Sequence, residues 1–401
     1  MIRGVKLVII PILVLSALDA LGADWPQFGG PTANFLAPDT GINKNWGQRP
    51  PQVLWRVSLG DDGFAGPSVA GGKVFITDHA GDQDIVKAFN LEDGKEVWRY
   101  SYQDTDKPNY GFARSTPVFS DGRIYALSRL GLLHCLNAEN GTKLWSRNMV
   151  NEFGGKRPKW DYAWSPVVDG DRLVILPGGS NAAVAVLNKA TGETIWTGGG
   201  SDGSGYSTPV VATILDRKQY VAFMATSLIG VDAAHGKLLW SVPWQTNYDV
   251  NAAMPIVVGN FVFITSGYNH GCALFEITPQ GPDQYWAEKF IVSHFSSPVF
   301  YNRFVYGTGD SGHLVCLNTR DPKVMWRQAG FQKGGLVAVD GVLIVMDDKQ
   351  GDVVMVNAST DGYQELGRIK PLGGQSWTAP VIANGKLIVR NKQAMACLDL
   401  M

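Results

Sequence analysis

The sequence repeats one short phrase along most of its length. The segments LEDGKEVW (91–98), LNAENGTKLW (136–145), KATGETIW (189–196) and AAHGKLLW (233–240) each place a Trp four residues after a Gly. Internal repetition constrains the fold more than any single motif does, because each unit must stack on its neighbours to bury its apolar face. We therefore expect a repeat protein.

The repeat has a period of 40 to 51 residues, measured between successive Trp residues. These are Trp55, Trp98, Trp145, Trp196, Trp240, Trp286 and Trp326. A second marker opens each unit, namely a Pro that mostly follows small residues and precedes an apolar pair. It occurs at Pro67, Pro117, Pro166, Pro209, Pro255, Pro298 and Pro380, with Val337 in the remaining place.

Each unit reads as four short strands. In the second unit these are PVFS, RIYALS, LLHCLN and KLWSRN, separated by turn residues. The Gly supplies positive φ for a tight hairpin, and the Trp is expected to cover apolar surface between neighbouring sheets. A period of this length with four strands is typical of a β-propeller.

The two ends of the chain predict how the ring closes. Residues 380–401 supply three strands, whereas PPQVLWRVSLG (50–60) supplies a fourth-type strand with no unit before it. Pairing them removes both free sheet edges. The expected fold is all-β, an eight-bladed β-propeller of four-stranded antiparallel blades in which an N-terminal strand completes the last blade. The seventh blade is the least regular, because Leu366 stands where Trp is expected.

The first residues have the pattern of a secretory signal peptide. Arg3 and Lys6 precede an apolar run, and small residues follow up to Ala23. We assign 1–23 to a signal peptide, 24–50 to an N-terminal lead-in segment and 51–401 to the propeller. The apolar run is shorter than a membrane span, and no Cys lies near the cleavage site. The expected mature protein is periplasmic or secreted, with no transmembrane segment and no lipid anchor.

The charge balance and the cysteine positions argue against a nucleic-acid-binding protein and against a disulfide-linked one. Lys plus Arg (35) nearly balances Asp plus Glu (36), so no nucleic-acid partner is expected. Cys135, Cys316 and Cys397 occupy one equivalent position of the repeat, and such positions lie too far apart for a disulfide. We expect these thiols, and that of Cys272, to be small buried hydrophobic groups.

The repeat carries a family resemblance. The phrase LNKATGETIW resembles the Trp-docking repeat of pyrroloquinoline quinone (PQQ) propellers, and the start DWPQFGGPTANFLAPDTGI resembles secreted PQQ-binding-like propellers. The chain is also similar to the outer-membrane assembly propeller BamB. The resemblance covers residues 24–401 and implies the fold. It leaves the function open, because function depends on the site rather than on the scaffold.

A binding site is expected on the face opposite the Gly turns. The links between blades emerge there, and two are unusually long and aromatic: SYQDTDKPNYGFARST and SRNMVNEFGGKRPKWDYAWS. Residues of these links, or just before each innermost strand, are the candidate ligand-binding or partner-binding residues; the alternative is that they plug the channel and satisfy buried backbone. They are Phe64, Arg114, Trp160, Tyr162, Trp164, Tyr206, Asn251, His294, Lys333 and Trp377.

The chemistry of known quinoproteins fits only in part. The resemblance implies a quinone held between a Trp and adjacent cysteines, with calcium on Glu and Asn and a catalytic Asp, but this sequence has no adjacent cysteines. We assign no catalytic residue and no metal ligand. Asp82 with Asp84, or Asp104 with Asp106, could bind calcium, but they are expected to be ordinary solvated turn residues.

Two functions follow from the sequence. The first is an exported, non-catalytic monomer that needs no cofactor and acts as a binding or scaffold module for an envelope protein or a small ligand. The alternative is a PQQ-dependent oxidoreductase with calcium and a reduced active site, in which Arg114 and Lys333 pair with the PQQ carboxylates.

Overall fold

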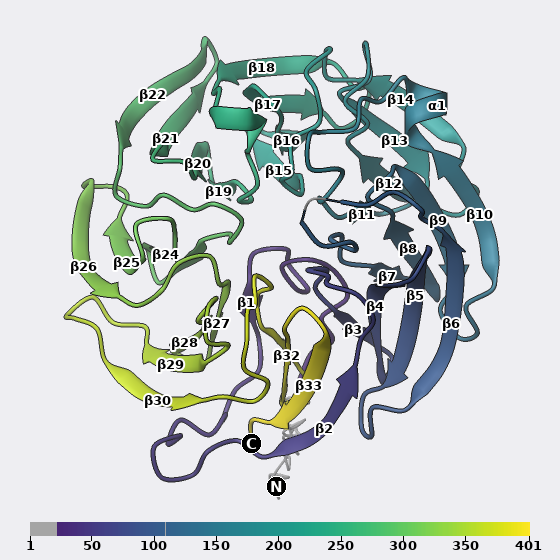
Figure 1. Cartoon of the computed structure of the whole chain (residues 1–401). Coiled ribbons are helices and arrows are strands. Elements are labelled where there is room, and N and C mark those ends of the chain that lie inside the picture. The colour runs from purple at the N-terminus through teal and green to yellow at the C-terminus, as the bar shows by residue number, and fades with distance from the viewer. Residues whose placement is uncertain (1–21, 109) are drawn as a thin grey trace, which may run out of the picture.

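The computed structural model describes residues 22–108 and 110–401. Almost all of the predicted signal peptide, 1–23, lies outside these residues. Within them the strands form eight sheets arranged around a central axis (Figure 1), which confirms the predicted eight-bladed β-propeller. The helices are short, α1 (Met149–Phe153) and the 3-10 helix η1 (Asn247–Asp249). In this part of the chain no helix has the length and apolar character to span a membrane.

Blades 1 to 4 each contain four consecutive antiparallel strands, with the innermost strand first. Blade 1 has β3 (Ser68–Ala70), β4 (Lys73–Ala80), β5 (Gln83–Asn90) and β6 (Glu96–Gln103). Blade 2 has β7 (Val118–Ser120), β8 (Arg123–Leu127), β9 (Leu132–Asn137) and β10 (Lys143–Asn148). Blade 3 has β11 (Val167–Asp169), β12 (Arg172–Ile175), β13 (Val184–Asn188) and β14 (Thr194–Gly198). Blade 4 has β15 (Val210–Ile214), β16 (Arg217–Phe223), β17 (Ser227–Asp232) and β18 (Leu238–Pro243).

Blades 5 to 7 continue this order, and blade 8 combines both ends of the chain. Blade 5 has β19 (Ile256–Val258), β20 (Phe261–Ser266), β21 (Gly271–Thr278) and β22 (Gly281–Glu288). Blade 6 has β23 (Val299–Tyr301), β24 (Phe304–Gly307), β25 (His313–Asn318) and β26 (Lys323–Ala329). Blade 7 has β27 (Leu336–Val339), β28 (Val342–Met346), β29 (Val353–Asn357) and β30 (Glu365–Ile369). Blade 8 has β31 (Val381–Ala383), β32 (Lys386–Arg390), β33 (Ala394–Asp399) and β2 (Val53–Ser58).

The ring closes through β2, as the sequence predicts. This N-terminal strand pairs antiparallel with β33, with Trp55 opposite Cys397. The described chain also begins beside blade 8, where the Asn384 amide donates to the Ala23 carbonyl, and it ends just after β33 of the same blade. In Figure 1 the C-terminus lies at this blade. Because β2 supplies the outermost strand that the C-terminus lacks, the last blade has its full set of four strands.

The lead-in segment is built into the propeller. Trp25 forms a β-bridge with Val69 in the innermost strand of blade 1. Further along the segment, β1 (Leu36–Ala37) pairs in parallel with β27, the innermost strand of blade 7. The segment therefore runs past blade 8 beside the central channel. In blade 7, where the repeat has Leu366 in place of Trp, Trp46 of the lead-in lies against Gly367.

The repeated Trp and Gly meet across blade boundaries. The Trp98 indole of blade 1 donates to the Ala138 carbonyl of blade 2 (3.0 Å) and lies on the turn at Gly141. At Gly141 φ is +73°, and an added Cβ would come within 2.5 Å of Trp98. Glycine is required there for both reasons. Trp55, Trp145, Trp286 and Trp326 donate in the same way to the next blade.

Trp240 of blade 4 departs from this pattern. Its indole nitrogen donates to the Gln219 side chain of its own blade (2.7 Å), and its ring lies over Gly230. In the turn of blade 5, a Cβ added to Gly281 would meet no atom of the described residues within 4 Å. The boundary between blades 4 and 5 therefore lacks the contact between a Trp and the Gly turn of the next blade.

Hydroxyl groups near the Pro of each repeat link the blades around the channel. The Ser165 hydroxyl accepts from the Thr116 amide (2.9 Å), and the Thr208 hydroxyl accepts from the Ser165 amide (2.9 Å). Thr378 of blade 8 donates to the Phe64 carbonyl before blade 1 (2.9 Å). Small polar residues precede the Pro because a hydroxyl there satisfies backbone groups of the adjoining blade.

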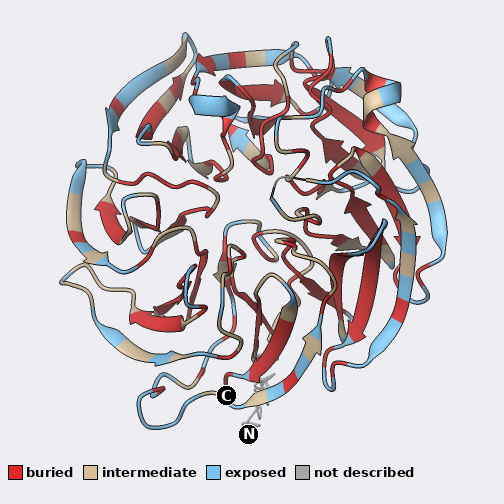
Figure 2. Cartoon of the chain, in the orientation of Figure 1, coloured by how far each residue is buried: buried red, intermediate tan, exposed pale blue. Residues whose placement is uncertain are grey.

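The core lies within and between the blades. The two middle strands of each blade are mostly buried (Figure 2). The innermost strands of blades 2 to 6 are mostly half-buried where they face the channel, and the outermost strands carry most of the exposed residues. The four cysteines are free and buried. Burial raises the pKa of the thiols to about 11 for Cys272 and Cys316, and to about 12 for Cys135 and Cys397. The expectation of buried, unpaired thiols is confirmed.

Replacing Trp98 by Ala is expected to lower the free energy of unfolding by about 3–5 kcal/mol, because it removes a buried aromatic ring and a hydrogen bond between blades. Leu144→Ala is the matched control, since this side chain is 48% exposed on an outermost strand. Denaturant unfolding followed by Trp fluorescence and circular dichroism measures both. Equal losses in the two variants would contradict the docking role of Trp98.

Candidate functional site

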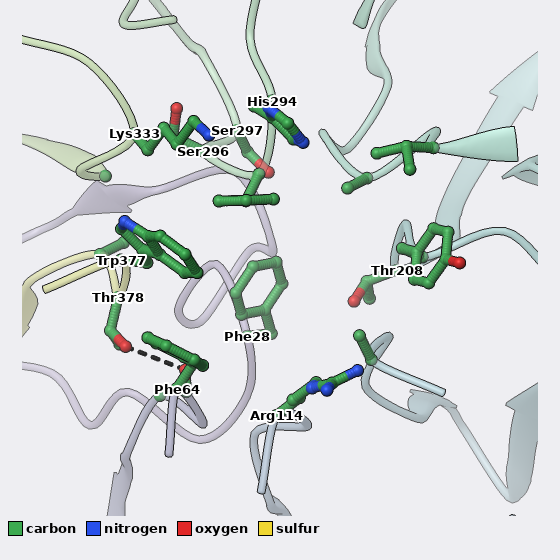
Figure 3. A pocket seen from close by; sticks show the side chains of 18 of the residues that line it. Phe28, Phe64, Arg114, Thr208, His294, Ser296, Ser297, Lys333, Trp377 and Thr378 are labelled. Atoms are coloured by element: carbon green, nitrogen blue, oxygen red, sulfur yellow. Dashed lines mark hydrogen bonds between the residues drawn. The ribbon is translucent and has the colours of Figure 1, made fainter. Parts of the chain in front are cut away.

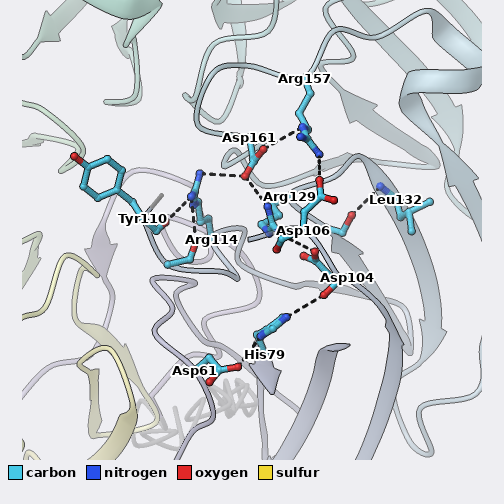
Figure 4. Close-up of polar contacts among 12 residues, drawn as sticks. Asp61, His79, Asp104, Asp106, Tyr110, Arg114, Arg129, Leu132, Arg157 and Asp161 are labelled. Atoms are coloured by element: carbon cyan, nitrogen blue, oxygen red, sulfur yellow. Dashed lines mark hydrogen bonds and ion pairs between the residues drawn. The ribbon is translucent and has the colours of Figure 1, made fainter. Parts of the chain in front are cut away.

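The long links lie on one face and are joined by ion pairs. The first link (104–117) follows β6, and the second (149–166) follows β10 and contains α1. Arg129, in the β8–β9 loop, donates to the carboxylates of Asp104 (2.5 Å) and Asp161 (2.8 Å). Arg157 bonds Asp106 at 2.8 Å (Figure 4). These contacts hold the two links together over blades 1 to 3.

A cavity of about 270 Å³ occupies the central channel on this face. Its walls come from the links before most of the blades, and Phe28 and Phe35 of the lead-in segment also line it. Figure 3 shows Phe28, Phe64 and Arg114 around the cavity, each from a different segment of the chain. A volume of this size suits an amino-acid side chain or a small ligand.

One wall of the cavity is aromatic and carries a cation. Phe64 and Trp377 stack with ring centroids 4.6 Å apart, and Phe295 lies 4.9 Å from Trp377. The Lys333 ammonium is 5.2 Å from the Phe295 centroid and 5.7 Å from that of Trp377. Such cation–π contacts hold a positive charge at an apolar surface.

Two further polar groups reach the cavity. The Arg114 guanidinium donates to the carbonyls of Tyr110 (2.5 Å) and Gly111 (3.1 Å), and burial lowers its pKa. His294 bonds the Asp310 carboxylate through Nδ1 at 3.0 Å. Burial alone would raise the pKa of Asp310, but the hydrogen bond from His294 lowers it below its ordinary value. The cavity therefore presents cationic donors beside aromatic faces.

A second, polar pocket of about 240 Å³ adjoins the cavity at Arg114 and Trp160. Its charged lining contains more cations than anions. The cations are Lys107, Arg114, Arg129, Arg157 and Lys159, and the anions are Asp106 and Asp161. The two pockets together favour a ligand that carries an acidic group next to an apolar group.

Seven of the ten predicted site residues line the cavity, namely Phe64, Arg114, Trp160, Tyr206, His294, Lys333 and Trp377. The other three do not reach it and are buried. Tyr162 donates to the Pro177 carbonyl (2.9 Å), and Trp164 donates to the Ser204 hydroxyl (2.9 Å). Asn251 donates to three carbonyls, including that of Met224. For these three, the alternative role of satisfying buried polar groups is the one observed.

Aromatic residues outside the predicted set also shape the site. Phe28 and Phe35 meet edge to face at 5.1 Å, and both belong to the aromatic lead-in, which has no repeat partner. Tyr248 lies 5.4 Å from Trp160 and 5.6 Å from Tyr268. The sequence could have indicated the two tyrosines, because the segments QTNYDV and SGYNHG are loops on the same face as the two long links.

The expectation that the paired aspartates are solvated is wrong for two of the four. Asp82 and Asp106 are exposed, but Asp84 and Asp104 are buried. Burial and the nearby charge of Asp104 raise the pKa of Asp84 to about 7. The spacing of each pair in the sequence is that of a turn. Asp84 and Asp104, however, lie at the ends of β5 and β6, where loops of the same face cover them.

The comparisons with known proteins identify the family. The profile of the family described as outer membrane protein assembly factor BamB matches residues 81–328. The chain belongs to this family. BamB of Yersinia pestis is 24% identical over 358 residues, which cover 84% of this chain and 76% of that protein.

Solved structures agree on the fold. BamB from Moraxella catarrhalis is similar with a TM-score of 0.63 and 16% identity, covering 87% of this chain and 97% of that one. A europium-containing methanol dehydrogenase has a TM-score of 0.66 and 13% identity, covering 94% and 98%. The chain thus shares its propeller fold with both BamB and a dehydrogenase, so the fold alone does not decide the function.

Replacing Arg129 by Met is expected to lower the free energy of unfolding by about 3–5 kcal/mol, because the buried Asp104 carboxylate loses its cationic partner. Asp161 loses the nearest of its three cations but keeps Arg157 and Arg114. The matched control is Arg157→Met, whose side chain is 42% exposed and whose loss should cost no more than about 1 kcal/mol. Thermal and denaturant unfolding compare the two variants. Similar stability of both would show that Arg129 does not hold the links together.

Proposed function

We propose that this protein is an exported, non-catalytic scaffold of outer-membrane assembly that binds a protein partner through its loop face. The family relationship supports a binding module, since its curated relatives are assembly factors by name. The predicted signal peptide supports export to the periplasm. The loop face supplies the binding surface, because the outermost strands and the Gly turns serve the packing of the blades.

The observation that carries the proposal is a group of aromatic residues at the mouth of the cavity, in which the exposed Tyr248 contacts the half-buried Trp160 and Tyr268. Tyr248 is 55% exposed and has φ of +61°, and Tyr268 next to it has φ of +54°. Bulky residues rarely adopt this left-handed backbone, which costs about 1–3 kcal/mol and is typical of functional sites. Aromatic side chains held exposed in this way are suited to a protein interface.

The charges around the mouth indicate the chemistry of the partner. The Lys159 ammonium is 4.4 Å from the Tyr248 centroid and 5.2 Å from that of Trp160. Together with the cationic pocket beside it, this surface is complementary to a segment that carries acidic and apolar side chains. An extended segment of an envelope protein could place an acidic residue at Arg114 and an apolar one against Trp377.

The second candidate function is a PQQ-dependent dehydrogenase. Its fold similarity and the cationic Arg114 and Lys333 favour it. The residues present do not fit the cofactor, however. None of the described residues that line the cavity is Asp, Glu, Asn or Cys, so the calcium that accompanies PQQ lacks its usual oxygen ligands there.

Titration of the purified protein with PQQ and calcium is expected to leave the visible spectrum of PQQ unchanged. Dye reduction with alcohols or sugars should stay at the level of free PQQ. The physical reason is the missing set of oxygen ligands in the cavity. A saturable spectral shift that is lost in Lys333→Ala would overturn this expectation and favour the dehydrogenase.

The scaffold function is tested by replacing Trp160 and Tyr248 together with Ala. Both side chains lie at the mouth, so folding should persist while capture of the partner from an envelope extract falls at least about tenfold, as expected for the loss of interface aromatics. Quantitative pull-down with tagged protein, followed by mass spectrometry, measures the capture.

The matched control is Tyr285→Ala, since this tyrosine is similarly exposed (54%) but lies on β22, away from the mouth. Capture should be unchanged in the control. Equal capture by the wild type and the double variant would contradict a partner site on the loop face. Trp164 is unsuitable for this test because it is fully buried.

A further inference from the structure

A second group of polar residues lies beneath the loop face of blade 1, apart from the cavity. His79 is the penultimate residue of β4, Asp84 is the second residue of β5, and Asp104 follows β6. Three neighbouring strands thus bring their ends to one place. One ligand atom from each residue lies within 4.8 Å of the others, and all three residues are buried.

The carboxylates of this group are only partly satisfied. Oδ2 of Asp104 and both oxygens of Asp84 have no hydrogen-bond partner of good geometry among the described residues, and the neighbouring donor to Asp84 is the buried Tyr102 hydroxyl. Asp84 is 0% exposed and Asp104 is 2% exposed. The other Asp104 oxygen accepts from Arg129 at 2.5 Å. Three buried acceptors in one place are costly unless a cation or a set of donors meets them.

The imidazole of His79 is oriented toward the same place. Its Nδ1 lies 2.9 Å from Asp61 Oδ2, which also accepts from the Gly81 amide at 3.0 Å (Figure 4). Its ring stacks on Phe112 with centroids 3.5 Å apart. A carboxylate that accepts from Nδ1 leaves Nε2 as a free acceptor, which is the usual arrangement behind a metal-binding histidine.

We propose that His79, Asp84 and Asp104 form a binding site for a divalent transition-metal ion, with Zn²⁺ as the best match. Two ligands about 2.1 Å from an ion lie at most about 4.2 Å apart. In a tetrahedral site the separation is about 3.4 Å, so these side chains, whose ligand atoms lie within 4.8 Å of one another, would move together by at most about 1.4 Å on binding the ion. One imidazole nitrogen with two carboxylates favours Zn²⁺ or Mn²⁺ over Ca²⁺, which prefers oxygen ligands alone.

A doubly protonated His79 is the competing explanation. It would donate to Asp61 and, through Nε2, to the Asp104 carbonyl, which lies 3.3 Å away. This arrangement accounts for the ring. Even with the Tyr102 hydroxyl turned toward Asp84, it leaves one Asp84 oxygen and Asp104 Oδ2 without a donor among the described residues. A dication satisfies the ring and the carboxylates together, and Asp61 then acts as the positioning residue of the site.

The experiment uses the mature protein, stripped with EDTA and then loaded with Zn²⁺, Mn²⁺ or Ca²⁺ alone. After gel filtration, elemental analysis should find one Zn²⁺ per chain and little Ca²⁺. Asp84→Asn has nearly the same shape and should lose that equivalent while keeping its circular dichroism spectrum. Asp61→Asn should keep the site but weaken Zn²⁺ binding about 10- to 100-fold by isothermal titration calorimetry.

The matched control is Asp310→Asn, because Asp310 holds a histidine in the same way but belongs to no cluster of metal-ligating side chains among the described residues. This variant should retain one Zn²⁺. Absence of stoichiometric Zn²⁺ or Mn²⁺ from the wild type would overturn the proposal, and so would equal retention by Asp84→Asn. Retention of Ca²⁺ alone would overturn the choice of a transition metal. None of these outcomes depends on capture of a protein partner.

Discussion

The contact between the outer Trp of one blade and the turn of the next is the interaction on which this fold depends. A four-stranded sheet of this size has two apolar faces and cannot bury both by itself. At Trp98 the indole covers the next sheet, and its nitrogen satisfies the carbonyl of Ala138. The contact thus buries apolar surface, and its hydrogen bond fixes the orientation of one blade relative to the next. Closure of the last blade by β2 allows these contacts to continue around the ring.

The asymmetry of the molecule arises where this contact is altered. Trp240 turns into its own blade, and Leu366 of blade 7 has no indole to offer. At blade 7 the lead-in segment contributes both β1 and Trp46. The same segment also carries Phe28 and Phe35 to the channel, where they line the cavity. The lead-in segment thus both completes the packing of blade 7 and lines the cavity.

Periodic features could be predicted from the sequence, and single departures from the period could not. The blade count, the closing strand and the position of most site residues follow from the spacing of Trp and Pro. Trp164 lies before the Pro of its repeat, as several cavity-lining residues do. Its burial depends on how link 149–166 folds, so it could not be predicted from the spacing. The left-handed backbone of Tyr248 and the convergence of Asp84 with Asp104 are likewise tertiary properties. Spacing in sequence carries no information about them.

The link after β6 connects the two polar regions of the loop face. Asp104 at its start belongs to the buried group with His79, and Arg114 at its end reaches the cavity. Arg129 bonds the Asp104 carboxylate on one side and Asp161 of the second link on the other. An ion bound by Asp104 and Asp84 would fix the start of the first link and, through Arg129, the second. The aromatic mouth depends on both links for its shape, so a buried metal site would act as an anchor for the binding surface rather than as a part of it.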